Sequence, residues 1–212
     1  MKKLLIATNN KGKVKELQDL LKVLNVQLVT PADLNLNLEV EEDGETYAEN
    51  AEKKARAFAQ ASGLVSLADD SGLEVDALDG APGLHSARYA PPLTLSPNSG
   101  NLGGARGGWT DSDRRAYMLE NLRGKPRPWT AHFHATIAVA FDGKVEFAEG
   151  DCYGEIIPEE RGNNGFGYDP IFFIPELNQT MAELDMETKN RISHRANAAR
   201  NALPVLKKIF EG

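Results

Sequence analysis

The sequence predicts an α/β protein. Over the first 68 residues, short apolar runs typical of buried strands alternate with segments of helical periodicity, in the order strand-helix-strand-helix-strand. Further along the chain, two long segments with strand character meet at Asp142-Gly143, a dipeptide that favours a tight hairpin. At 212 residues, the chain is long enough to bury a substantial core in one or two lobes.

The alternation begins at the N-terminus. Leu4 to Thr8 is predicted to be a buried strand, followed by a turn in which Asn10 caps a helix. Val26 to Thr30 is predicted to be a second short strand, which Pro31 ends. The helix between the two strands is supported by apolar residues at helical spacing, namely Val14, Leu17, Leu20, Leu21 and Leu24.

An acidic connection over residues 34–45 leads to the next helix. Thr46 opens this helix, which is rich in Ala and charged residues and runs to Ser62, and the Gly63 that follows is a typical stop signal. Val65 to Ala68 is the third predicted strand. Residues 91–108 are rich in Gly, Pro and Ser and show no periodicity, which predicts a flexible loop.

The second half of the chain continues the mixture of helices and strands. A helix is expected to start at Asp111 or Ser112 and to end at Leu122. Thr130 to Phe141 and Lys144 to Ile157 are the two predicted hairpin strands. The tail is predicted to be helical from Ser193 through Ala202, and Pro204 is expected to restart or kink this helix.

Composition excludes several classes of protein. The formal net charge of −7 argues against a general nucleic-acid binder, which needs a basic face. The single cysteine, Cys152, excludes an internal disulfide and a cysteine-rich zinc site. The apolar run at the N-terminus is too short for a signal peptide or a membrane span, so we expect a cytoplasmic protein with neither a membrane nor a nucleic-acid partner.

The stretch that says most about chemistry is Asp69-Asp70-Ser71-Gly72, directly after the third predicted strand. A strand that delivers paired carboxylates to a turn favours a hard divalent cation such as Mg²⁺, which binds carboxylate oxygen and keeps waters for phosphate chemistry. The alternative is a solvated turn, because Asp, Ser and Gly all favour turns.

Two further polar groups have both a functional and a structural interpretation. Thr8–Lys13 combines the start of a helix with a hydroxyl, an amide and a lysine, which indicates an anion site, and the alternative is an ordinary capped turn. His132 and His134 share one face of a predicted strand. We interpret them as face residues, with a metal site as the alternative.

Five motifs follow one another along the chain. They are Thr8–Lys13; the acidic Glu41–Gly44 with Tyr47–Ala51 and Lys53–Ala55; Ala68–Leu73; Gly80–Gly83 with Ser86–Tyr89; and Gly165–Pro170 followed by Lys189 and Ser193–Arg195. From Leu4 to about Ala202, their order and spacing resemble the inosine triphosphate pyrophosphatase family. The chain departs from the family pattern at Asn163-Asn164, where members often have Thr-Gly, and in the Gly-rich segment 96–108, which looks longer than usual.

This resemblance implies a fold and an activity. The fold is a single domain over residues 1–212, in which helices flank an elongated, mixed, twisted sheet and two lobes enclose a central cleft. The activity is hydrolysis of noncanonical purine nucleoside triphosphates (ITP, dITP and XTP) to the monophosphate and pyrophosphate, which removes deaminated purines from the nucleotide pool. The resemblance also implies Mg²⁺ as cofactor and a homodimer.

The same resemblance assigns roles to residues. Asp70 matches the family's proton acceptor, and Asp70 together with Glu41 or Glu42 matches its metal ligands. Asp69 would orient Asp70 or balance its charge. The residues implied to contact the substrate are Thr8, Asn10, Lys13, Lys54, Ser71, Phe166, Gly167, Tyr168, Asp169, Lys189, His194 and Arg195.

Recognition of the purine is expected to depend on hydrogen-bond donors. Arg195 has only donors, so it suits the 6-oxo group of hypoxanthine or xanthine and not the 6-amino group of adenine. A site of this kind can reject the wrong analogue by about 10⁴-fold. Phe166 would stack on the base. Without the resemblance, Phe166 is interpreted as a core residue and His194-Arg195 as the exposed first turn of a helix.

Three rival functions stay open on the sequence. A metal phosphatase would release orthophosphate instead of pyrophosphate. A pyrophosphatase related to septum inhibitors would prefer pyrimidine or modified bases. A nucleotide sensor would bind its ligand without turnover.

Overall fold

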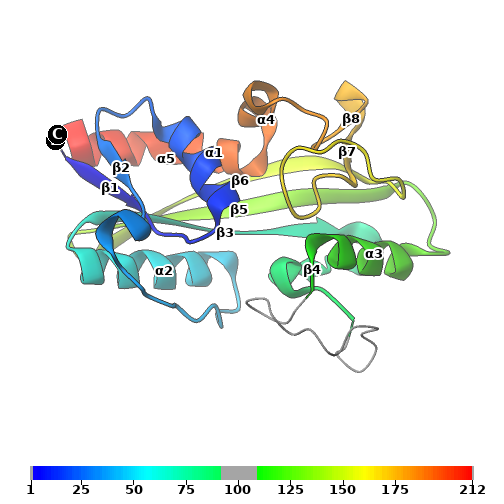
Figure 1. Ribbon diagram of the computed structural model, residues 1–212, viewed down its shortest axis with the longest axis horizontal. Coiled ribbons are helices and arrows are strands. Elements are labelled where there is room, and N and C mark those ends of the chain that lie inside the picture. The colour runs from blue at the N-terminus through cyan, green and yellow to red at the C-terminus, as the bar shows by residue number, and fades with distance from the viewer. Residues whose placement is uncertain (1, 92–108, 212) are drawn as a thin grey trace. The chain divides into compact units, whose positions relative to one another are not determined.

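The computed structural model describes residues 2–91 and 109–211 and has a mixed α/β fold (Figure 1). The strands are β1 (Lys3–Ile6), β2 (Gln27–Val29), β3 (Val65–Val75), β4 (Pro82–Gly83), β5 (Trp129–Phe141), β6 (Lys144–Ile156), β7 (Phe172–Ile174) and β8 (Gln179–Thr180). The α-helices are α1 (Lys11–Leu21), α2 (Tyr47–Ser62), α3 (Asp111–Leu122), α4 (Met186–Ile192) and α5 (His194–Glu211).

The strands form one mixed sheet. Their order is β2-β1-β3-β5-β6-β7-β8, with β4 paired to β3. β1 pairs in parallel with β2 and β3, whereas β7 pairs antiparallel with β6 and β8. The predicted α/β class with a mixed sheet flanked by helices is therefore confirmed. Of the predicted flexible loop 91–108, residues 92–108 lie outside the described part of the chain.

The chain divides into two compact units. The first comprises Met1–Ser71, Phe133–Cys152 and Met186–Gly212, and the second comprises Gly72–His132 and Tyr153–Asp185. Strands β3, β5 and β6 contribute residues to both units. The single domain expected from the resemblance stays a prediction.

In the first unit, helices cover both faces of the sheet (Figure 1). Side chains alternate between the faces of a strand, so successive residues of β1 belong to different cores. Leu4 and Ile6 pack with residues of α1 and α5, whereas Leu5 packs with residues of α2. Gly150 on β6 permits a close approach of α5, because a Cβ atom there would overlap the backbone of Ala198.

The third strand is longer than predicted. β3 continues through Asp69-Asp70-Ser71-Gly72 to Val75, so the predicted turn after Ala68 is wrong. Asp and Gly disfavour strands, and the pairing of β3 with β1 ends at Leu67, but β5 continues as the neighbour of β3 on the other side, and this tertiary context outweighs the local preference. The acidic pair therefore lies inside a strand, where adjacent side chains point to opposite faces.

Other predicted elements are confirmed with small shifts of their ends. Asp142 and Gly143 have φ values of 46° and 73°, the left-handed geometry that a tight hairpin between β5 and β6 requires. Helix α5 runs without interruption from His194 to Glu211, so Pro204 does not restart it. The short strands β4, β7 and β8 and the helix α4 have no counterpart among the predicted elements.

The second unit contains α3, β4, β7 and β8. Thr110 and Asp113 form a capping box at the start of α3. Ser86 connects three segments of this unit: its hydroxyl accepts a hydrogen bond from the N–H of Leu73 at 2.8 Å and donates to the carbonyl of Gly83 at 2.6 Å, while its own carbonyl accepts from the Tyr168 hydroxyl at 2.9 Å. Two motif segments, 86–89 and 165–170, are thus tied together.

Candidate functional site

The polar residues of the first unit gather where β1 ends beside β3. Ile6 pairs with Leu67 in parallel register, so the residues after β1 lie beside Asp69. Asn10 caps α1, since its side-chain oxygen accepts hydrogen bonds from the backbone N–H groups of Gly12 at 2.9 Å and Lys13 at 3.2 Å. The capped-turn interpretation is correct for Asn10, and the substrate contacts expected of Thr8 and Asn10 stay predictions.

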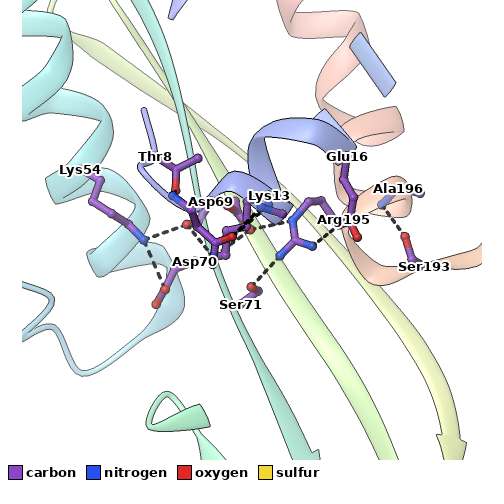
Figure 2. A network of polar contacts seen from close by, with 12 residues as sticks. Thr8, Lys13, Glu16, Lys54, Asp69, Asp70, Ser71, Ser193, Arg195 and Ala196 are labelled. Carbon is purple, nitrogen blue, oxygen red and sulfur yellow. Dashed lines mark hydrogen bonds and ion pairs between the residues drawn. The ribbon is translucent and has the colours of Figure 1, made fainter. Parts of the chain in front are cut away.

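Asp69 lies on the face of β3 that α1 and α5 cover (Figure 2). Its carboxylate is 3.2 Å from the Lys13 ammonium and 3.1 Å from Arg195 Nε, and the side chain is fully buried. Ser71, two residues along the same face, accepts a hydrogen bond from Arg195 Nη2 at 3.0 Å. Asp69 therefore links a lysine of α1 to an arginine of α5.

Asp70 points to the opposite face, toward α2 (Figure 2). Its two oxygens contact two residues that lie one helical turn apart on α2: Asn50 Nδ2 at 3.2 Å and Lys54 Nζ at 3.3 Å. Lys54 also donates to the main-chain oxygen of Asp69 at 2.8 Å and lies 3.2 Å from Glu42. Burial lowers the pKa of Lys54, but the charges of Asp70, Asp69 and Glu42 outweigh it and raise the pKa overall, so Lys54 remains a cation.

A second buried carboxylate, Glu16 of α1, extends the network on the α5 side. Glu16 accepts a hydrogen bond from Arg195 Nη1 and lies 2.9 Å from the Lys189 ammonium. The side chain of Arg195 is 2% exposed and donates to Glu16, Asp69 and Ser71. Arg195 therefore has a structural role that the sequence did not indicate, and its contact with a 6-oxo group stays a prediction.

Opposite charges keep this network ionised. Burial would raise the pKa of Asp69, but the positive charges of Lys13 and Arg195 outweigh it and hold the pKa below its ordinary value. The pKa of Glu16 is likewise lowered, because Arg195 and Lys189 overcome the effect of burial. Burial lowers the pKa of Arg195, yet the two carboxylates raise it overall. These groups therefore remain charged at neutral pH.

His194 and Arg195 begin α5 and are buried, so the alternative of an exposed first turn is wrong. The imidazole of His194 stacks on Phe133 with ring centroids 4.7 Å apart and an interplanar angle of 16°. Its Nδ1 is buried without a hydrogen-bond partner among the described residues. Burial, together with the positive charges of Arg195 and Lys189, moves the pKa of His194 well below its ordinary value, so the ring is neutral.

The acidic run reaches this site through Glu42. Glu41 is exposed, whereas Glu42 is half-buried and pairs with Lys54. Asn50 anchors the run, because its side-chain oxygen accepts a hydrogen bond from the N–H of Gly44 at 2.8 Å while its amide donates to Asp70. The structure thus brings Glu42 to the cation that Asp70 also contacts.

The donor set around Lys54 suits Mg²⁺. Glu42 and Asp70 already share one cation, the Lys54 ammonium, at 3.2 and 3.3 Å. Within residues 2–91 and 109–211, no group of three or more His, Cys, Asp or Glu residues could hold a metal. Mg²⁺ usually takes one or two carboxylates and completes its shell with water and substrate phosphate, so two carboxylates fit it better than a metal that needs a full protein cage.

The predicted residues Phe166 to Asp169 form a turn in the second unit. Asp169 is buried and accepts a hydrogen bond from the N–H of Phe166 at 2.9 Å. Tyr168 is buried and uses its hydroxyl within the fold, whereas Phe166 is half-buried. Gly167 has a φ of 61°, which glycine adopts without strain. Contact of these four residues with a nucleotide stays a prediction.

The two strand histidines have ordinary partners. His134 Nδ1 lies 2.7 Å from Asp151 and Nε2 lies 2.9 Å from the Thr136 hydroxyl. In the second unit, His132 stacks on Tyr153 with ring centroids 5.3 Å apart. These contacts support the interpretation of both as face residues.

Glu16 and Asn50 were not predicted as members of the site. Asp69 was predicted only to orient Asp70 or to balance its charge. Asn50 belongs to a quoted motif, and its spacing of four from Lys54 on a predicted helix was a usable signal. Glu16 offered a weaker one: a charged residue directly before Leu17, beside the apolar stripe of a helix.

Known proteins resemble this chain over nearly its full length. The family model described as the Ham1 family matches residues 4–205. The dITP/XTP pyrophosphatase of Desulforamulus reducens is 49% identical over 210 residues, covering 98% of this chain and 97% of that protein. The dITP/XTP pyrophosphatase of Thermus thermophilus is 44% identical over 207 residues, covering 97% and 92%.

Solved structures of similar sequence have the same fold as this chain. A HAM1 protein from Coxiella burnetii superposes with a TM-score of 0.83 at 38% identity, covering 98% of this chain and all of that one (100%). The Staphylococcus aureus Ham1 protein superposes with a TM-score of 0.77 at 36% identity, covering 100% and 99%. None of the helices in the described residues combines the length and the apolar composition that crossing a membrane requires.

Proposed function

The chain belongs to the Ham1 family, and on that premise we propose that it hydrolyses noncanonical purine nucleoside triphosphates (ITP, dITP and XTP) to the monophosphate and pyrophosphate. The bond broken is the α–β phosphoanhydride. This activity would remove deaminated purines from the nucleotide pool. The names of the relatives, dITP/XTP pyrophosphatase, support the substrate class.

One observation carries the proposal: two lysines converge on the strand that holds Asp70. Lys13 and Lys54 both donate to the main-chain oxygen of Asp69, at 3.5 and 2.8 Å. In this structure, Asp69, Asp70 and Glu42 balance the two ammonium groups. A polyphosphate chain that exchanged with some of these carboxylate contacts would find two cationic donors at one point. The start of α1, with Thr8 and Asn10, would add backbone and side-chain donors for the phosphates.

Asp70 is the proposed proton acceptor. Its carboxylate faces α2 and is held in place by one cation, Lys54, and one amide, Asn50. It would accept the proton of the water that attacks the α-phosphorus. Asp69, one residue away, is committed to Lys13 and Arg195, so it would position these two side chains and take no part in proton transfer.

Mg²⁺ is the proposed cofactor, with Glu42 and Asp70 as its protein ligands. When bound, the ion would neutralise phosphate charge and lower the pKa of a bound water. Lys54 now lies between these carboxylates, so it would shift toward the phosphates in the loaded enzyme. Glu41 is the weaker candidate ligand because it is exposed.

Base selection is proposed to depend on Phe166, which would stack on the purine, and on His194 and Arg195. Gly167, Tyr168, Asp169, Ser71 and Lys189 complete the proposed substrate contacts. For Arg195 to donate to a 6-oxo group, it must share or exchange one of its present partners, Glu16, Asp69 or Ser71. The proposal includes a cytoplasmic location, as expected from the short apolar run at the N-terminus, and a homodimer, as the resemblance implies.

A pyrophosphate-release assay across ITP, XTP, GTP and ATP in Mg²⁺ tests this function. We expect ITP and XTP to be hydrolysed far faster than ATP, by about 10⁴-fold if the purine is selected through hydrogen-bond donors. Turnover should stop when EDTA is added and return with Mg²⁺. Release of orthophosphate would instead indicate a phosphatase, and binding of ITP without product over hours would indicate a sensor. Equal rates on ITP and ATP would refute the substrate class.

A further inference from the structure

Both backbone polar groups of Gly167, its N–H and its carbonyl, are bound by side chains from the first turns of α3. The N–H of Gly167 donates to Asp111 Oδ2 at 2.9 Å, and the carbonyl of Gly167 accepts a hydrogen bond from Arg115 Nη1 at 2.8 Å. Asp111 and Arg115 lie four residues apart, one helical turn, on the same side of α3. All these residues belong to the second unit.

Each of the two side chains is itself held in position. Asp111 Oδ1 pairs with Arg114 Nη1 at 2.8 Å. Arg115 forms a two-bonded ion pair with Glu160, with both N–O distances at 2.9 Å, and its side chain is only 12% exposed. A planar guanidinium bound in this way keeps its remaining donor direction fixed. Asp111 and Arg115 therefore form a clamp on the two peptide groups that flank the Cα atom of Gly167.

The clamped residue lies within the turn from Phe166 to Asp169. Gly167 has a φ of 61°, a left-handed conformation that glycine adopts readily. The same turn is closed from the other side by Asp169, which accepts from the N–H of Phe166. The N–H that Asp111 binds belongs to the peptide that joins Phe166 to Gly167, so a change in the orientation of this peptide would move the Phe166 ring.

We propose that Asp111 and Arg115 are positioning residues that set nucleobase selectivity by fixing the backbone on both sides of Gly167. The proposal rests on the proposed function, in which Phe166 and its neighbours contact the purine. The clamp fixes the part of the site that meets the base and leaves the phosphate-binding lysines untouched. Its loss should weaken recognition of the base and spare recognition of the triphosphate.

The test compares Asp111→Ala and Arg115→Met with the control Asp113→Asn. Asp113 forms the capping box with Thr110 and lies on the same first turn, so its replacement weakens α3 without removing a clamp contact. For the two clamp variants, we expect KM for ITP to rise about tenfold and kcat to stay within about threefold, as expected when one or two hydrogen bonds that orient the base are lost. The preference for ITP over ATP should fall by a similar factor.

Two further measurements separate positioning from general destabilisation. Inorganic tripolyphosphate, which has no base, should inhibit the clamp variants with an unchanged inhibition constant. Hydrogen–deuterium exchange of the peptide that contains Gly167 should accelerate in the clamp variants and stay unchanged in Asp113→Asn, whatever the enzyme hydrolyses. Hydrogen–deuterium exchange tests the clamp itself, whereas turnover of ITP by the wild type tests the proposed function. The two failures can therefore be told apart.

The outcomes are distinct. A rise in KM for ITP and faster exchange at Gly167, with unchanged tripolyphosphate inhibition, supports the proposal. Unchanged exchange, or an unchanged preference for ITP over ATP in folded clamp variants, overturns it. If Asp113→Asn lowers the ITP preference as much as the clamp variants do, the effect comes from α3 stability and the proposal is also overturned. Thermal melting of each variant establishes that it is folded.

Discussion

Arg195 Nε lies 3.1 Å from Asp69 Oδ2, and neither side chain is more than 2% exposed. This ion pair joins the first residues of α5 to the middle of β3, although the two residues are 126 positions apart in the sequence. In a buried pair, the loss of one partner leaves an uncompensated charge, so the rest of the network depends on both groups. Around this pair, Asp69 also contacts Lys13, and Arg195 also contacts Glu16.

Asp70→Asn is expected to lower kcat for ITP by about 10²-fold or more, since a general base typically contributes 10²–10⁴-fold. Asn keeps the size of Asp and can still bond Asn50 and Lys54, so nucleotide binding should stay measurable. Pyrophosphate release and a binding titration check the two parts. The control is Asp142→Asn in the hairpin, where φ is 46° and Asn is equally suited, which should leave turnover unchanged. Near-normal turnover in Asp70→Asn would remove Asp70 from the role.

Lys54→Met is expected to destabilise the protein by about 3 kcal/mol, because removing one member of a buried ion cluster leaves the other charges unpaired. The buried main-chain oxygen of Asp69 also loses its hydrogen bond at 2.8 Å. Urea unfolding measures the free-energy change. The matched control is the neighbouring Lys53→Met, because Lys53 pairs with Asp43 on the surface and its loss should have no measurable effect. Equal effects of the two substitutions would contradict the assignment of Lys54 to the network.

Glu16→Gln should cost about 3 kcal/mol of stability, since it removes the negative charge between Arg195 and Lys189. We also expect KM for ITP to rise more than kcat falls, because the change affects the orientation of two proposed substrate-binding side chains. Unfolding and steady-state kinetics check the two effects. Glu52→Gln is the control, since Glu52 pairs with Arg56 at the surface of α2. A variant as stable as the wild type would show that Glu16 does not hold this network together.

His194 makes stability depend on pH. Its folded-state pKa lies well below the ordinary value of 6.5, so below that pH the unfolded chain takes up a proton that the folded protein does not. The stabilisation is therefore complete above pH 6.5 and is lost as the pH falls. Between pH 7.5 and pH 5.5, the wild type should lose about 1 kcal/mol more stability than His194→Gln, since one pKa unit corresponds to about 1.4 kcal/mol. Parallel curves for the two proteins would show that His194 titrates normally.

Much of the architecture and the family could be predicted from the sequence. The helices after Asn10 and Thr46 and the hairpin at Asp142-Gly143 depend on caps, periodicity and turn residues, which are local properties of the chain. The family could be inferred from the order of short motifs in the sequence alone. The partners within the site could not be predicted in this way, because α5 and β3 meet only in the folded chain.

The clearest difference concerns Asp69 and Asp70. As a sequence, two adjacent aspartates before Ser-Gly indicate a turn that favours a divalent cation, in which Asp70 would be the ligand and Asp69 its support. In the folded protein, β3 continues through them beside β5, and the alternation of a strand sends Asp69 toward Arg195 and Asp70 toward Lys54. By itself, the sequence determined which residues are present and the local elements that they form. Only the tertiary structure decided which charges neutralise each other, because that depends on which strands and helices pack together.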